Sequence, residues 1–106
     1  MKDVPFEVKR VFWTYNVPDG KSRGAHAHKR QRQLLIAVHG SFTVNVDDGK
    51  EQKAFILDNP YKGLLVEPGE WSSEDYFSPD GVCLVLCDDF YDDKDYIREY
   101  NDFLNG

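Results

Sequence analysis

Long apolar runs are missing from this sequence of 106 residues. No stretch approaches the roughly 20 consecutive apolar residues that a membrane-spanning helix needs. The first ten residues, MKDVPFEVKR, also lack the apolar stretch of a signal peptide. We therefore expect a cytoplasmic protein that has no membrane partner.

Cysteine is scarce as well, with only Cys83 and Cys87, both within the apolar segment VCLVLC. If that segment is a strand, its four-residue spacing separates the two cysteines by roughly 13 Å, which is beyond disulfide reach. The sequence has no Cys-x-x-Cys pair and no Cys/His metal cluster. Both cysteines are expected to be core thiols.

Positive charge is in the minority, since the net charge is -6, and a nucleic-acid partner is therefore not expected. Acidic residues gather at 88–102, whereas residues 21–33 contain no acid. The basic residues of that second segment are Lys21, Arg23, Lys29, Arg30 and Arg32. They favour a small anionic ligand, although a solvated charged face is the alternative.

Short apolar segments alternate with turn signals along the chain. Asp48-Gly49 is a strong hairpin signal, and Pro18-Asp19-Gly20 and Pro68-Gly69 are further turn sequences. Strands are expected at 6–15, 33–38, 41–46, 53–58, 63–67 and 82–87. This spacing predicts a β-sandwich or barrel, and the length predicts one domain over 1–106.

The C-terminal segment 92–104 has a different periodicity. Its apolar residues Tyr96, Ile97, Tyr100, Phe103 and Leu104 recur at helical spacing. Acidic residues at 92, 93 and 95 would complement the dipole at the start of such a helix. The apolar stripe is expected to pack on the sheet, with a partner-binding face as the alternative.

His26 and His28 lie two residues apart, so a strand would direct both imidazoles to one face with Ala27 opposite. Three interpretations of this pair are open: a metal site, proton transfer on a substrate, or a structural hydrogen-bonded pair. Paired neutral imidazoles are suited to proton transfer near neutral pH. The adjoining basic segment, which includes Arg23, favours a catalytic role.

Metal binding is disfavoured by the residues that surround the pair. In metal-binding cupins, which are small β-barrels, a carboxylate and a distant third histidine complete the site, but Gln33 and Ser72-Ser73 stand in those places here. His39 abuts the Gly40 turn and is expected to point away from the barrel. No metal or cofactor is expected, because divalent ions normally need three or more protein ligands. A metal-dependent cupin enzyme, with Glu74 as a candidate ligand, is the alternative.

At these residues the chain resembles the nucleotide-sugar 3,4-ketoisomerases of the cupin superfamily, the WxcM-like proteins. The resemblance extends from about residue 5 to residue 104, and the Arg-Gly-x-His-Ala-His motif together with the C-terminal motif is specific. The matching segments are 23–29 (RGAHAHK), 33–36 (QLLI), 40–41 (GS), 47–49 (DDG), 68–71 (PGEW) and 91–103 (YDDKDYIREYNDF).

The resemblance implies an all-β, cupin-type jelly-roll barrel with a short C-terminal α-helix. It implies a metal-free conversion of a dTDP-4-keto-6-deoxy-hexose to its 3-keto isomer through an enediol, for 3-amino sugars of surface glycans. His26 and His28 would share the proton transfers. A homodimer is also implied, with the aromatic strand 6–15 as a plausible interface.

By the same resemblance, Arg23, Tyr15, Gln33 and Trp71 would bind the nucleotide-sugar substrate. Arg23 would stabilise the enediolate or the diphosphate. Tyr15 would donate to a sugar oxygen or serve as a core aromatic. Trp71 would stack on thymine or sugar, or fill the barrel.

Two departures from the family keep a second function open. Family members begin about two strands earlier, so the N-terminal segment is expected to be missing, and Ser72-Ser73 replace a frequent His-Glu pair. The alternative is a non-catalytic nucleotide-sugar-binding module of a polysaccharide locus.

Overall fold

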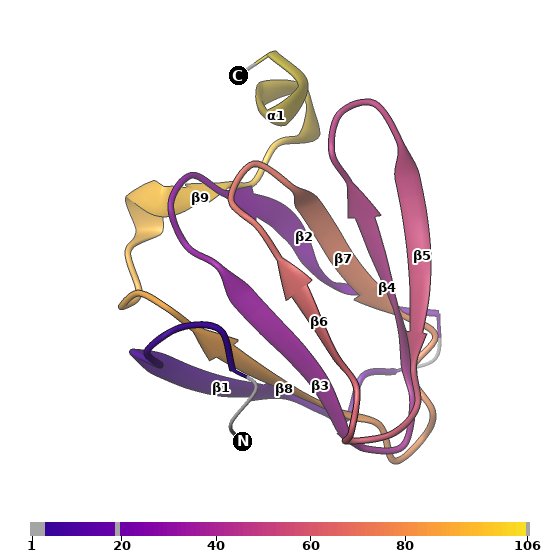
Figure 1. The fold of residues 1–106 in the computed structure, drawn as a ribbon. Helices are drawn as coiled ribbons and strands as arrows, with labels where there is room; N and C mark the ends of the chain where they lie inside the picture. The colour runs from indigo at the N-terminus through magenta and orange to yellow at the C-terminus, as the bar shows by residue number, and fades with distance from the viewer. Residues whose placement is uncertain (1–3, 19, 106) are drawn as a thin grey trace.

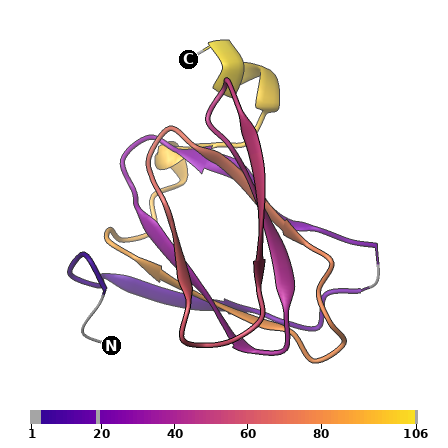
Figure 2. The same ribbon diagram turned by 45° about the vertical axis from the view of Figure 1, so that its right-hand side comes forward.

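Two antiparallel β-sheets face each other in the computed structural model, which describes residues 4–18 and 20–105 (Figures 1 and 2). One sheet has the strand order β1-β8-β3-β6, and the other has the order β5-β4-β7-β2-β9. The strands are β1 (Arg10–Thr14), β2 (Arg23–His28), β3 (Gln33–His39), β4 (Phe42–Asp47), β5 (Gln52–Leu57), β6 (Gly63–Val66), β7 (Trp71–Asp75), β8 (Val82–Cys87) and β9 (Tyr96–Ile97). This confirms the all-β, jelly-roll class predicted from the sequence.

The core lies between the sheets, and the alternation of side chains along each strand builds it. Phe42 and Val44 of β4 point inward beside Leu35 of β3 and Val85 of β8, each at most 2% exposed. Cys83 and Cys87 are buried and free, as expected of core thiols. Strand β8 covers the residues predicted for it, and β3 to β6 agree with their predicted ranges to within about one residue.

Three elements differ from the predictions. Strand β1 covers only Arg10–Thr14 of the predicted 6–15. Strand β2 was absent from the list of predicted strands and begins at Arg23, after the predicted Pro18-Asp19-Gly20 turn. That turn is partly described: the Lys21 N–H donates to the Pro18 carbonyl, and Asp19 lies outside the described residues. Strand β7 was not predicted, because its inward residues Ser72 and Glu74 are polar and hide the usual apolar alternation.

The C-terminal helix is shorter than predicted. Asp93–Asp95 form one turn of 3-10 helix, Tyr96–Ile97 form β9, and only Tyr100–Asn105 form the α-helix, α1. Pairing of β9 with Ala27 and His28 of β2 overrides the helical stripe. Figure 2 shows α1 beside the tip of the β4–β5 hairpin, where the Tyr100 hydroxyl donates to Asp47.

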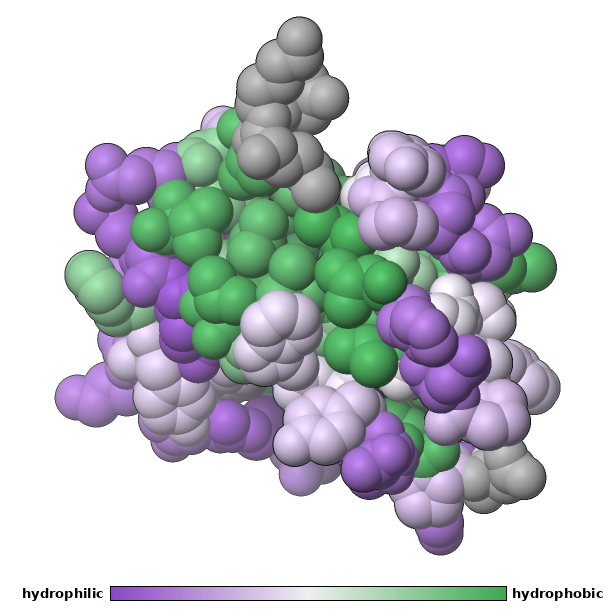
Figure 3. Space-filling model, turned by 90° about the horizontal axis from the view of Figure 1, so that it is seen from below, coloured by the Kyte–Doolittle hydropathy of each residue, from purple (hydrophilic) through white to green (hydrophobic). Residues whose placement is uncertain are grey.

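The outer face of the β1-β8-β3-β6 sheet is apolar (Figure 3). On β1 and just beyond it, Val11, Trp13 and Tyr15 point outward and are 48%, 57% and 61% exposed. Leu84 and Leu86 of β8 lie half-buried beside them. Among the described residues, no helix has the length and apolar character needed to cross a bilayer.

Candidate active site inside the barrel

A cavity of about 260 Å³ lies between the two sheets. One wall comes from β1, β3 and β8, and the other comes from β2, β7, β9 and the residue just beyond β9. Its lining residues are Phe12, Thr14, Arg23, Gly24, His26, Gln33, Leu35, Glu74, Val85, Tyr96 and Arg98. Pockets that enclose drug-sized ligands measure roughly 300–1,000 Å³, so this cavity suits a single small ring.

His26 and His28 share the inner face of β2, as the i, i+2 spacing predicted. Their rings meet edge to face with centroids 4.8 Å apart. The Tyr96 ring packs against both, at 4.9 Å from His26 and 4.4 Å from His28. His26 lines the cavity, whereas His28 lies behind it and is only 3% exposed.

Asp95 determines which nitrogen of His28 carries the proton. The Asp95 carboxylate is 2% exposed and accepts hydrogen bonds from the backbone N–H groups of Arg30 and Gln31, at 2.8 and 3.2 Å. His28 Nδ1 lies 3.2 Å from the same carboxylate. Because a carboxylate only accepts, Nδ1 must donate. His28 Nε2, which is buried and has no partner in the described residues, is therefore the basic nitrogen of the neutral ring.

Burial keeps both imidazoles neutral. Burial, with smaller contributions from the nearby His28, Arg98 and Arg10, lowers the pKa of His26 to about 4. Burial also lowers the pKa of His28, although the hydrogen bond and charge of Asp95 oppose this shift. At neutral pH both rings can therefore accept a proton, which is the state that a general base requires.

Polar side chains outside the cavity lining hold two of the residues that line it. Arg10 Nη2 donates to the Tyr96 hydroxyl at 3.0 Å and crosses from one sheet to the other. Gln33 Nε2 donates to Gln31 Oε1 at 2.9 Å, and both glutamine side chains are buried. These contacts hold Tyr96 and Gln33 in place beside the cavity.

Comparison of the chain with known proteins identifies the family to which it belongs. The family model described as "FdtA: WxcM-like, C-terminal" matches residues 1–106. The chain belongs to this family. A TDP-4-oxo-6-deoxy-alpha-D-glucose-3,4-oxoisomerase from Aneurinibacillus thermoaerophilus is 42% identical over 102 residues, which is 96% of this chain and 73% of that protein.

Solved structures of 3,4-ketoisomerases are also similar to this WxcM-like chain. The enzyme from Helicobacter canadensis has a TM-score of 0.94 at 40% identity, covering 98% of this chain and 78% of that one. A mutant of QdtA from Thermoanaerobacterium thermosaccharolyticum, in complex with TDP-4-keto-6-deoxyglucose, has a TM-score of 0.94 at 35% identity, covering 97% and 75%. A dTDP-4-dehydrorhamnose 3,5-epimerase from Bacillus anthracis, 19% identical with a TM-score of 0.77 and covering 88% and 59%, shares the fold alone.

The structure of this WxcM-like chain brings together Arg23, Gln33 and His26 of the predicted site, and all three line the cavity. Arg23 itself is exposed, and its guanidinium donates to the carbonyl of Ser22 at 2.8 Å. Tyr15 does not join them. Phe12 and Thr14 point into the cavity, so alternation turns Tyr15 outward, where it is 61% exposed. It is neither a cavity residue nor a core aromatic.

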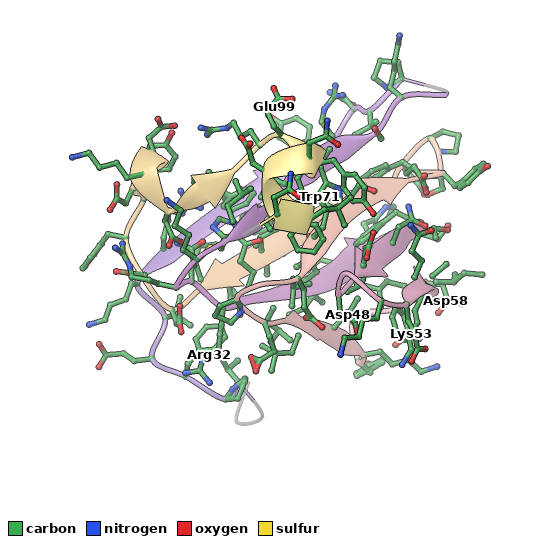
Figure 4. The ribbon with its side chains drawn as sticks, turned by 90° about the horizontal axis from the view of Figure 1, so that it is seen from above. Arg32, Asp48, Lys53, Asp58, Trp71 and Glu99 are labelled. Atoms are coloured by element: carbon green, nitrogen blue, oxygen red, sulfur yellow. The ribbon has the colours of Figure 1, made fainter. Side chains whose placement is uncertain are left out.

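Trp71 also lies elsewhere, because Ser72 and Glu74 occupy the inward positions of β7. Trp71 packs instead against α1 on the outer face of the sheet, with its ring centroid 5.2 Å from that of Tyr100 (Figure 4). It lines a separate groove with Asn45 and Asp47. Trp71 therefore does not fill the barrel, which was one of the two roles considered for it, and the histidine cavity does not include it.

Asp95, Tyr96 and Arg98 lie near the histidines but were given no role in the predicted active site, and Glu74 was named only as a candidate metal ligand. Glu74 and Tyr96 line the cavity with Arg98, and Asp95 supports His28. The Asp-Tyr-Ile-Arg sequence at 95–98 was visible, but its helical periodicity concealed that Tyr96 and Ile97 form a strand beside β2. His39 is exposed and lies near Asp80, which confirms that it points away from the barrel.

The described residues contain no group of three or more His, Cys, Asp or Glu side chains that could hold a metal ion. At the place of a metal-binding carboxylate, Gln33 presents its amide to Gln31 and to the Cys87 sulfur instead. The donor set at the cavity therefore fits organic acid–base chemistry better than metal coordination.

Proposed function

We propose that this protein is a TDP-sugar 3,4-ketoisomerase that converts a TDP-4-keto-6-deoxy-hexose to its 3-keto isomer without a metal ion. One observation carries the proposal: His26, kept neutral by burial, opens onto a ring-sized cavity that it shares with Arg23 and Gln33. Relatives at 35–42% identity that carry this activity in their names support it.

The chemistry requires a base beside C3 of the sugar. The C4 ketone acidifies the C3 proton, and removal of that proton gives an enediolate, which is then reprotonated at C4. In the proposal, His26 faces the sugar and takes the C3 proton, and the His28 ring packs edge to face against His26 from behind. Arg23 stabilises the enediolate charge or the diphosphate, as a guanidinium is suited to do.

The test is a deuterium-exchange measurement. Purified protein is incubated with TDP-4-keto-6-deoxyglucose in deuterated water, with and without a chelator, and the sugar protons are followed by NMR. We expect deuterium at C3 or C4 together with a 3-keto product, at the same rate in both samples. Binding without exchange would support a nucleotide-sugar-binding module instead, and loss of exchange with chelator would overturn the metal-independent reaction.

We also propose that the protein forms a homodimer through the apolar face of the β1-β8-β3-β6 sheet. Trp13 lies on that face and is 57% exposed. Trp13→Glu is expected to shift the protein to monomer in light scattering, because a charge on this face opposes apolar burial. Tyr61→Glu, at a loop residue that is 95% exposed, is the control. A monomeric parent protein, or a Trp13→Glu variant that stays dimeric, would contradict this interface.

A cytoplasmic location and a role in surface-polysaccharide biosynthesis complete the proposal. They are supported by the nucleotide-sugar chemistry of the relatives, whose names specify TDP-linked sugars. The measurement that checks the pathway role is the loss of 3-amino sugars from surface glycans when the gene is deleted.

A further inference from the structure

Glu74 places a carboxyl group inside the barrel, on the wall that also holds His26. Strand β7 turns it inward, and it is only 6% exposed. It lines the cavity, and in the described residues neither a hydrogen-bond donor nor a positive charge compensates it. Burial, with a smaller contribution from Asp75, raises the pKa of Glu74 to about 8. At neutral pH the group is therefore mostly a neutral acid with one O–H.

The backbone of β2 makes room for this carboxyl. Gly24 has φ +71, and a Cβ at that position would lie only 2.7 and 2.8 Å from the two Glu74 carboxyl oxygens. The β2–β7 register is irregular at this point, between Arg23 and His26. A larger residue at position 24 would displace the acid, so Gly24 shapes this part of the cavity around Glu74.

We propose that Glu74 is a catalytic acid of the isomerisation, which carries the hydroxyl proton between O3 and O4 of the bound keto sugar. This inference rests on the proposed function. In the first half-reaction, a histidine takes the C3 proton, the electrons of the C3–H bond form the C3=C4 bond, and O4 receives the proton of the Glu74 O–H.

In the second half-reaction, the O3 hydroxyl gives its proton to the Glu74 carboxylate as the C3=O3 bond forms. The electrons of the C3=C4 bond then take the proton that the histidine returns to C4. Glu74 ends protonated, as it began, and the histidine ends neutral. The reaction therefore needs no oxidant, reductant or second substrate.

A carboxyl group suits this transfer better than an imidazole does. Its two oxygens point to the same side, so one can donate while the other accepts from a neighbouring sugar oxygen. The two nitrogens of an imidazole point in divergent directions and cannot span adjacent oxygens. Arg23 and Arg98, in the same cavity wall, add positive charge where the enediolate forms.

Several charged or titratable groups lie in or beside the cavity around Glu74, and of these only Asp75 contributes to the shift of its pKa. Arg23 and His26 come from β2, Asp75 from β7, Cys83 from β8, Tyr96 from β9, and Arg98 from the segment that follows β9. Burial and the neighbouring Glu74 raise the pKa of the Cys83 thiol, so it stays uncharged near Glu74. Deprotonation of Glu74 at alkaline pH removes the proton donor, so the rate should fall there.

The test compares Glu74→Gln with the parent protein from pH 5 to 9. The amide keeps the shape and hydrogen bonds of the acid but cannot transfer a proton. We expect kcat to fall by about 10²-fold or more, within the usual range for an acid–base group, while KM changes by less than about threefold. The alkaline decline of kcat should disappear in the variant. Ser73→Ala, on the outward side of the same strand, is the control and should keep the parent rate.

Deuterium exchange adds a second readout. In the Glu74→Gln variant, deuterium should be incorporated at C3 of the substrate faster than the 3-keto product forms, because the histidine still removes the C3 proton. A variant that keeps more than about a third of the parent kcat, with its alkaline decline intact, would overturn the role of Glu74 alone. A parent protein that does not isomerise the sugar would overturn both this role and the proposed function.

Discussion

The two halves of the barrel interior obey the same alternation of side chains but differ in chemistry. In the half formed around β4, the inward residues Phe42 and Val44 pack with Leu57, and all are at most 4% exposed. In the half formed by β2 and β7, the inward residues include His26 and Glu74 around a cavity. One half supplies burial energy, and the other desolvates acid–base groups so that they are neutral at pH 7.

The largest expected effect is on catalysis in the polar half. His26→Asn removes the imidazole that faces the cavity, so isomerisation of TDP-4-keto-6-deoxyglucose should slow by about 10²- to 10⁴-fold. The melting temperature should change little, because His26 forms no part of the apolar cluster. His39→Asn changes an exposed histidine outside the cavity and should keep full activity. Equal losses in the two variants would contradict the site.

Substitutions in the apolar half should lower stability and leave activity unchanged. Phe42→Ala removes a ring that is 1% exposed and stacks on Phe77 with centroids 5.0 Å apart. The free energy of unfolding should fall by about 3–5 kcal/mol, measured by urea denaturation. Phe55→Ala, at a site that is 38% exposed, should cost much less. The activity of the fraction that remains folded should be unchanged if the two halves are separable.

Glu74 should make stability depend on pH. Its pKa is 4.5 when unperturbed and about 8 in the fold, so the native state keeps a proton that the unfolded chain has released between these values. The stability that this proton confers is complete below pH 4.5 and is lost as the pH rises through about 8.

Relative to Glu74→Gln, the parent protein should therefore lose on the order of 4 kcal/mol of unfolding free energy between pH 4.5 and pH 8.5. The low pKa of His26 gives a slope of opposite sign, since its stability is lost as the pH falls from 6.5 through about 4. Both proteins contain His26, so its contribution cancels when the unfolding free energy of one is subtracted from that of the other. A difference that does not vary with pH would show that Glu74 ionises normally.

Substitution of Asp95 is expected to lower both the stability and the activity, each by less than the substitutions above. Asp95→Asn places an amide where His28 and two backbone N–H groups now donate to a carboxylate. Unfolding free energy should fall by about 1–3 kcal/mol, because buried donors lose their acceptor. Isomerisation should slow by about tenfold or more, because His28 is no longer held with Nε2 as its base. Asp58→Asn, at an exposed site, is the control for both measurements.

Much of the apolar half was predictable from local sequence. Gln33–His39 and Val82–Cys87 are strands because their residues form short apolar runs between turn signals. The polar half was harder to predict from the sequence, because Ser72 and Glu74 occupy inward positions of β7 without forming an apolar pattern. The helical spacing of Tyr96 and Ile97 was misleading because β9 pairs with a strand about 70 residues earlier in the chain.

By itself, the sequence determined that His26 and His28 lie on one face of a strand, because alternation is a property of the local backbone. It also placed Arg23 next to them and put an amide, Gln33, where a metal site needs a carboxylate. Only the tertiary structure decided which of these side chains meet. Burial, the Asp95 hydrogen bond and the Glu74 carboxyl all depend on pairing between distant strands, and the protonation states follow from that burial.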